Sequence, residues 1–237
     1  MKYLHCVFDL YGTLVDIHTD EGSLRLWTGM ADFYRSRGAD WQPEDAYFRE
    51  VFAEEHGRTR LRQDAHEAHP EIQLEAVFQC LFRLKGVTAG MHFQRLSTDY
   101  IRLYDGVLEF LTRLRGRGYR LCLLSNAQSM FTRIELEQLG LMPYFDGIFL
   151  SSDYGVKKPD RRFFDMFFRG SGISPSQAVM IGNDGVCDIQ GAREAGMAAV
   201  YLRSNLSPNK PVPYADLALA RMDWGQVEAF LDDGDCR

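Results

Sequence analysis

The chain has 237 residues, enough for one large domain or for one domain with an inserted module, and 46% of them are hydrophobic, so a substantial core can form. Its net charge of −6 argues against a nucleic-acid partner, and none of its apolar runs is long enough to cross a bilayer. The five cysteines are odd in number and none form a C-x-x-C pair, which favours a reduced, cytoplasmic protein.

The first predicted element is a short buried strand over Leu4–Phe8, which ends directly at Asp9. From about Ile17 to Leu103 the pattern changes to helical periodicity with many charges and almost no strand signal. Helices are expected there over Leu24–Arg37, Pro43–Glu55, Ile72–Leu84 and Met91–Tyr104. We interpret residues 17–104 as an all-helical cap inserted after the first strand, and residues 1–16 and 105–237 as the core.

Beyond this insert, short apolar runs alternate with segments of helical periodicity. The expected strands lie at Arg120–Leu124, Gly147–Leu150, Ala178–Ile181 and Ala198–Leu202. The expected helices lie at Val107–Arg117, Phe131–Leu139, Arg161–Arg169 and Asp188–Ala195. Such alternation predicts an α/β fold, a doubly wound, Rossmann-like parallel sheet covered by helices on both faces.

Polar clusters follow several of the predicted strands. They are Asp9–Leu14, Ser125–Asn126, Lys157–Asp160 and Asn183–Asp188. Because ligands bind at the carboxyl ends of the strands in an open parallel sheet, we expect these clusters to form one site. Gly12 is expected to permit a tight turn directly after the first cluster begins.

The residue types in these clusters suit nucleophilic chemistry. A carboxylate can attack an electrophile if it stays ionised and correctly placed. A lysine ammonium beside such a carboxylate favours its charged form and neutralises anionic substrate oxygens. A serine hydroxyl can hold an oxyanion, and a further acidic cluster can bind Mg²⁺ or activate a water. A small anionic substrate is therefore expected.

These clusters, in this order and at these strand ends, resemble the four motifs of the haloacid dehalogenase superfamily. The helical insert matches the position of that superfamily's cap. The resemblance implies a hydrolase that forms a covalent ester on Asp9 during turnover. It implies catalytic roles for Asp9, Ser125, Lys158 and Asp188. It implies that Thr13 and Asn126 bind the transferred group.

The resemblance also implies a Mg²⁺ site. Its ligands would be Asp9, the backbone carbonyl of Tyr11, and a side chain from the fourth motif. Asp184 and Asp188 have the D-x-x-x-D spacing of that motif. Asn183 stands where an aspartate is usual, so either Asn183 or Asp184 could be the direct ligand.

Two features of the sequence point in opposite directions, one toward the superfamily's dehalogenases and the other toward its phosphatases. Phosphatases usually carry an acid/base aspartate where this chain has Tyr11, and a phenol with a pKa near ~10 is a poor general base. The superfamily's dehalogenases carry tyrosine there, because a halide needs no proton. Those dehalogenases, however, use no metal and keep one aspartate in the fourth motif, whereas this chain has Asp184 and Asp188.

Three functions therefore stay open. The leading hypothesis is Mg²⁺-assisted hydrolysis of a small organic phosphate with a good leaving group. The second is a metal-independent 2-haloacid dehalogenase. The third is binding of a phosphorylated ligand with little turnover, because Tyr11 removes the acid/base. The protein is expected to be a monomer or a homodimer.

Overall fold

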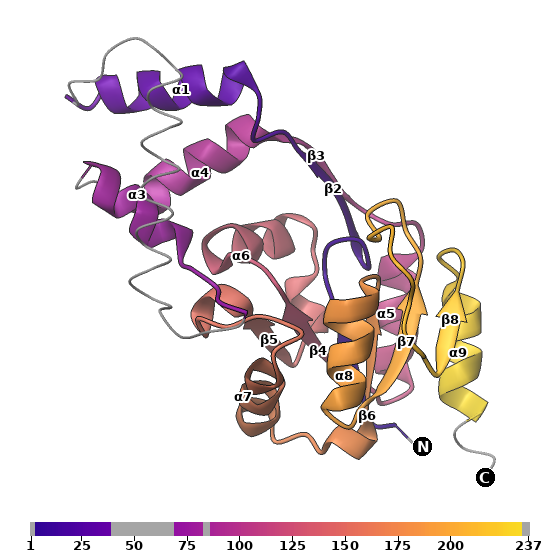
Figure 1. Ribbon diagram of the computed structural model, residues 1–237. Coiled ribbons are helices and arrows are strands. Elements are labelled where there is room, and N and C mark those ends of the chain that lie inside the picture. The colour runs from indigo at the N-terminus through magenta and orange to yellow at the C-terminus, as the bar shows by residue number, and fades with distance from the viewer. Residues whose placement is uncertain (1–2, 39–68, 83–85, 234–237) are drawn as a thin grey trace.

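The computed structural model describes residues 3–38, 69–82 and 86–233. Within these residues the core is a six-stranded sheet of parallel neighbours in the order β5-β4-β1-β6-β7-β8 (Figure 1). The strands are β1 (His5–Phe8), β4 (Arg120–Ser125), β5 (Gly147–Leu150), β6 (Ala178–Gly182), β7 (Ala198–Leu202) and β8 (Leu217–Leu219). The predicted strands are confirmed to within one residue at each end, and β8 is an additional strand.

Helices cover both faces of this sheet, which confirms the predicted α/β, doubly wound fold. The helices α5 (Val107–Gly116), α6 (Ser129–Gln138) and α9 (Trp224–Asp233) share one apolar cluster with the sheet. The helices α7 (Arg161–Ser171) and α8 (Gly191–Glu194) share the cluster on the opposite face. Phe8 belongs to the first cluster and Val7 to the second, because successive side chains of a strand point to opposite faces.

Short helical turns complete the core. They are η1 (Met142–Tyr144), η2 (Ser151–Asp153), η3 (Pro175–Gln177) and the π-helical turn η4 (Gly185–Gln190). The helix expected over Asp188–Ala195 is thus the end of η4 followed directly by α8, and it starts three residues earlier, at Gly185. Asp184 begins this turn as its N-cap, a role that short polar side chains suit.

Between β1 and α5 the chain forms the inserted helices α1 (Leu24–Arg35), α3 (Leu74–Phe82) and α4 (Gly86–Ser97). They pack on one another through an apolar cluster of their own, which includes Met30, Phe78 and Phe93. A two-stranded antiparallel ribbon, β2 (Val15–Thr19) and β3 (Thr98–Leu103), joins them to the core (Figure 1).

This ribbon corrects the sequence prediction of residues 17–104 as all-helical. The helix expected over Met91–Tyr104 ends at Ser97, and Thr98–Leu103 is a strand paired with Val15–Thr19. The division into a core and a cap at residues 17 and 104 stays a prediction. The expected helix over Pro43–Glu55 lies outside the described residues, as does the end of the one expected over Ile72–Leu84.

Among the described residues, no helix is both long enough and apolar enough to span a membrane.

Candidate active site

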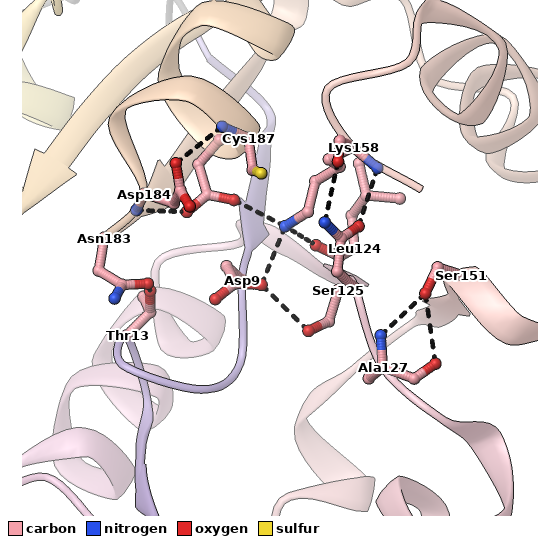
Figure 2. Close-up of polar contacts among 12 residues, drawn as sticks. Asp9, Thr13, Leu124, Ser125, Ala127, Ser151, Lys158, Asn183, Asp184 and Cys187 are labelled. Atoms are coloured by element: carbon pink, nitrogen blue, oxygen red, sulfur yellow. Dashed lines mark hydrogen bonds and ion pairs between the residues drawn. The ribbon is translucent and has the colours of Figure 1, made fainter. Parts of the chain in front are cut away.

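The central strand β1 delivers Asp9 to the carboxyl edge of the sheet. Phe8 pairs with Leu123 of β4 on one side and with Ile181 of β6 on the other. The Asp9 backbone amide then donates to the Ile181 carbonyl at 3.0 Å. Ser125 ends β4 and Asn183 follows β6, so three of the predicted clusters meet around Asp9 (Figure 2).

Lys158 binds two carboxylates at this edge. Its ammonium donates to Asp9 Oδ1 at 2.9 Å, to Asp188 Oδ1 at 2.7 Å and to the Leu124 carbonyl at 2.7 Å. Ser125 Oγ donates to the same Asp9 oxygen at 3.0 Å. The other Asp9 oxygen points away from Lys158, toward the side on which Asn183 lies (Figure 2). The Asp9 carboxylate is therefore held in one orientation with one oxygen directed into the site.

Burial and the neighbouring charges set the protonation of Lys158 and Asp188. Burial opposes the charge on Lys158, but the neighbouring Asp188 and Asp9 carboxylates outweigh it and raise the pKa of Lys158, which stays an ammonium. Burial raises the pKa of Asp188 to about 7, because Lys158 compensates only in part and Asp9 adds a second negative charge. Two carboxylates thus share one cation.

Asn126 positions Lys158 rather than pointing its amide freely into the site. Its side-chain nitrogen donates to the Lys158 carbonyl at 2.9 Å, and its side-chain oxygen accepts from the Lys158 backbone amide at 2.8 Å. Both ends of the amide are engaged, so the β4 end and the Lys158 loop are tied together. Substrate binding by Asn126 stays a prediction.

The turn after Asp9 places Thr13 against the fourth motif. Gly12 has a φ of +82°, and a Cβ on it would lie 2.1 Å from the Asn183 side-chain nitrogen, so glycine is required there for two reasons. Thr13 is fully buried, and its hydroxyl donates to Asn183 Oδ1 at 3.3 Å. In the structure Thr13 therefore orients Asn183.

Asn183 and Asp184 differ in how their side chains are used. The Asn183 side-chain nitrogen donates to Ser204 Oγ at 3.5 Å. Asp184 Oδ1 accepts from the backbone amide of Cys187 at 2.9 Å (Figure 2) and from that of Val186 at 2.8 Å. The Asp184 amide donates to Asp188 Oδ2 at 2.8 Å. The start of η4 thereby fixes Asp188 beside Lys158.

Tyr11 brings its side chain to α6, which the sequence did not predict. Its hydroxyl is 2.9 Å from Thr132 Oγ1 and donates to Glu135, and Glu135 also accepts from Gln94 of α4. Burial and the Glu135 charge raise the pKa of the Tyr11 phenol well above its ordinary value. The phenol is thus neutral at physiological pH, as the sequence predicted for a poor general base.

A pocket of about 180 Å³ opens over this group. The described residues that line it are Asp9, Tyr11, Ser125, Asn126, Lys158, Asn183, Asp184, Cys187, Asp188, Leu206 and Pro208. All of the predicted site residues except Thr13 are among them. Leu206 and Pro208 come from the loop after β7, and their apolar side chains gave no chemical signal in the sequence.

The family that matches the chain agrees with this geometry. A model of the haloacid dehalogenase-like hydrolases matches residues 3–196, which include every residue of the site named in the sequence analysis. The chain belongs to the haloacid dehalogenase-like hydrolases. It is accordingly a hydrolase.

Curated relatives of this hydrolase carry phosphatase names. A phosphoserine phosphatase of Thermus thermophilus is 36% identical over 115 residues, which are 48% of this chain and 46% of that protein. A glyceraldehyde 3-phosphate phosphatase of Methanothermobacter thermautotrophicus is 28% identical over 166 residues, 69% of this chain and 70% of that protein. The match to the first relative thus spans less than half of its length.

Solved structures share the fold. A 2-haloacid dehalogenase of Pseudomonas syringae has a TM-score of 0.69 at 21% identity, with 98% of this chain and 99% of that chain covered. A phosphatase of the same superfamily from Thermococcus onnurineus has a TM-score of 0.64 at 23% identity, with 96% and 97% covered. At these identities the likeness shows the fold alone.

Proposed function

We propose that this hydrolase is a Mg²⁺-assisted phosphatase that acts on a small organic phosphate through an ester on Asp9. The observation that carries the proposal is the charge of the catalytic pocket. Among the described residues that line it are three aspartates, Asp9, Asp184 and Asp188, and one lysine, Lys158, so carboxylates outnumber cations even while Asp188 is protonated. A phosphate ester is itself anionic, so a further cation is needed before it can approach Asp9.

The oxygen donors in the pocket fit Mg²⁺. We assign its binding to the Asp9 carboxylate, the Tyr11 carbonyl and an oxygen of Asn183 or Asp184, all from residues that line the pocket. No group of three His, Cys, Asp or Glu side chains is gathered for a metal in the described parts of the chain. Mg²⁺ does not require one, since it keeps several waters and uses one or two carboxylates. Bound Mg²⁺ would offset the repulsion between Asp9 and the phosphate.

The two neighbouring donors can be distinguished by calorimetric titration with Mg²⁺. Asn183→Asp adds a charge beside Thr13, and it should tighten Mg²⁺ binding if position 183 is the direct ligand. Asp184→Asn should weaken binding more than Asn183→Ala if Asp184 is the ligand. Mg²⁺ affinity that is the same in all three variants would contradict the assignment of either residue.

Asp9 and its neighbours can carry out the covalent step. An Asp9 oxygen attacks phosphorus, the bond to the leaving-group oxygen breaks, and the ester on Asp9 is then hydrolysed by water. Ser125 and Lys158 hold the carboxylate in place through its other oxygen, and Lys158 also offsets negative charge on the phosphoryl group.

The leaving group should depart without help from a carboxylic acid. The Tyr11 phenol is bound to Thr132 and Glu135, and no carboxyl replaces it at that position. General acid catalysis is typically worth ~10²–10⁴ in rate, so acyl and aryl phosphates should be preferred over alkyl phosphates. His18 is a poor candidate to supply the proton, since it lies exposed on the ribbon, 2.8 Å from Asp99, outside the residues that line the pocket.

A second candidate, metal-independent 2-haloacid dehalogenation, is favoured by Tyr11 alone.

The experiment that distinguishes the two functions is a substrate panel measured with Mg²⁺ and with a chelator. It contains acetyl phosphate, p-nitrophenyl phosphate, phosphoserine, glyceraldehyde 3-phosphate and 2-chloropropionate. We expect acetyl and p-nitrophenyl phosphate to be turned over fastest, and only with Mg²⁺.

Chloride release from 2-chloropropionate that survives chelation would establish the dehalogenase instead. Binding of phosphate without turnover of any substrate would support the binding function and overturn the phosphatase.

A further inference from the structure

Glu135 is a buried carboxylate between the catalytic loop and the inserted helices. It lies on α6 and is 4% exposed. One of its oxygens, Oε2, accepts from the Tyr11 hydroxyl, and the other, Oε1, accepts from the Gln94 side-chain amide of α4. The two donors come from segments of the chain that are 83 residues apart (94 − 11).

Burying this carboxylate has a cost that packing alone does not explain. No ion pair of Glu135 is found among the described residues, and burial raises its pKa although both hydrogen bonds oppose the shift. A neutral side chain of similar size would avoid that cost. A carboxylate, however, is an acceptor at both oxygens, so it can take donors from two sides at once.

The Tyr11 contact reaches the catalytic loop. Tyr11 is two residues after Asp9, and its hydroxyl is bound both by Glu135 and by Thr132, one turn earlier on α6. The loop then closes through the Gly12 amide, which donates to the Val15 carbonyl at 2.7 Å. Holding the phenol on α6 therefore limits how the backbone between Asp9 and Gly12 can turn.

The Gln94 contact reaches the inserted helices. Gln94 lies on α4, which packs on α6 and runs without a break into β3 of the ribbon. Gln94, Glu135 and Tyr11 all line a cavity of about 300 Å³. Tyr11 and Asn126 line both this cavity and the catalytic pocket, so the two are adjacent.

We propose that Glu135 is a positioning residue that couples the seating of α4 on the core to the orientation of the catalytic loop. When α4 is seated, Gln94 and Tyr11 satisfy one oxygen each. When α4 moves away, Glu135 loses a donor and the loop loses part of its anchor. The inference rests on the proposed catalytic role of Asp9, but its structural half can be measured without any substrate.

An exchange of donor and acceptor tests the coupling. In Glu135→Gln the amide oxygen can still accept from Tyr11, but the charge that strengthens both hydrogen bonds is lost, and Gln94 must turn its amide over to accept from the new amide nitrogen. Adding Gln94→Glu restores a charged acceptor opposite that nitrogen. Glu137→Gln is the matched control, since Glu137 is an exposed residue of the same helix.

Two measurements follow each variant: hydrogen exchange of the amides from Gly12 to Val15, and kcat and KM for p-nitrophenyl phosphate. Glu135→Gln should speed exchange of the loop and lower kcat by about tenfold with little change in KM. The double variant Gln94→Glu, Glu135→Gln should recover most of both, and Glu137→Gln should change neither.

A double variant as impaired as Glu135→Gln, or loop exchange that Glu135→Gln leaves unchanged, would overturn the coupling. If no phosphate ester is turned over by the wild type, the proposed function fails, and the exchange measurement still decides whether Glu135 couples α4 to the loop.

Discussion

Lys158 is buried between Asp9 and Asp188, and the charges of Lys158 and Asp188 depend on these neighbours. A lone buried ammonium would lose its proton, and a lone buried carboxylate would gain one. Together they keep Lys158 charged and leave a pocket with more carboxylates than cations. That surplus of negative charge supports the proposed Mg²⁺ site over the metal-independent alternative.

Asp9→Asn tests the nucleophile. The amide is nearly isosteric and its oxygen can still accept from Ser125 and Lys158, but it cannot attack phosphorus. Turnover of p-nitrophenyl phosphate should fall by on the order of 10³-fold or more. Thermal unfolding should change little, because Lys158 keeps Asp188 as its partner. Asp165→Asn, on the outer part of α7, is the surface control, and retained activity in Asp9→Asn would remove the nucleophile assignment.

Asp188 predicts a pH dependence of stability. Its pKa in the folded protein is about 7, above its usual 3.8, so between these values the folded state binds more protons than the unfolded state. The contribution of Asp188 to the free energy of unfolding therefore falls as the pH rises from about 4 to 7. Urea denaturation at pH 5 and pH 8, without Mg²⁺, should show the wild type losing on the order of 1 kcal/mol or more relative to Asp188→Asn. A constant difference between the two proteins would contradict this.

Individual site residues were predictable where chemistry follows a strand. Asp9, Ser125 and Asn183 each come directly after an apolar run, and the register of parallel strands brings them together. Glu135 was not predictable, because a charged residue in a helix normally marks the solvent side. Its burial depends on Tyr11 and Gln94, which are distant in the sequence and carry no joint pattern.

At the scale of elements, the strands of the sheet could be predicted from the sequence, whereas the strand β3 of the ribbon could not. A central parallel strand such as β6 is buried on both faces and reads as a continuous apolar run. The strand β3 is largely exposed, with Asp99, Tyr100 and Arg102 among its six residues, so its sequence resembles the outer side of a helix. Only its pairing with β2 determines its conformation, and that pairing is not visible locally.

Asp16 holds this ribbon to the core. It is 3% exposed and accepts from Arg102 of β3 at 3.0 and 2.7 Å, and from Asn205, in the loop after β7, at 2.9 Å. Burial opposes ionisation, but these hydrogen bonds outweigh it and lower the pKa of Asp16 below its usual 3.8. Asp16→Asn should lower the free energy of unfolding at pH 7 by about 1–3 kcal/mol.

The sign of the pH effect is opposite to that of Asp188. Because the pKa of Asp16 is lowered by folding, its stabilisation is present above 3.8 and is lost as the pH falls through the folded value. Chemical denaturation at pH 7 and near pH 3 should show the difference from Asp16→Asn shrinking at the acid end. Asp99→Asn, on the exposed side of β3, is the control and should have a small effect at both. A difference that persists in acid would point to packing instead.

At the scale of the whole molecule, the inserted helices are a second apolar unit beside the sheet. Their cluster around Met30, Phe78 and Phe93 is separate from the two clusters of the core. The junction combines polar contacts, such as Leu74 N to Gln128 Oε1 at 3.0 Å and Ser151 Oγ to Glu71 at 2.8 Å, with packing of Met130 and Phe131 of α6 against this cluster. The polar contacts can exchange with water at less cost than apolar packing can separate.

This arrangement predicts that the inserted helices move relative to the sheet. Closure over the catalytic pocket would exclude bulk water while Asp9 attacks the substrate, and the crossings of the ribbon near Asp16 and Tyr104 are the expected hinges. Small-angle X-ray scattering should give a smaller radius of gyration with Mg²⁺ and orthovanadate, a phosphate mimic, than with Mg²⁺ alone. The ribbon amides of β2 and β3 should exchange hydrogen more slowly in the closed state. Glu135→Gln should weaken this response while Glu137→Gln retains it, because Glu135, unlike the exposed Glu137, contacts both α4 and the catalytic loop. Scattering and ribbon exchange that are identical with and without orthovanadate, under conditions where calorimetry shows it bound, would mean that the two units move as one.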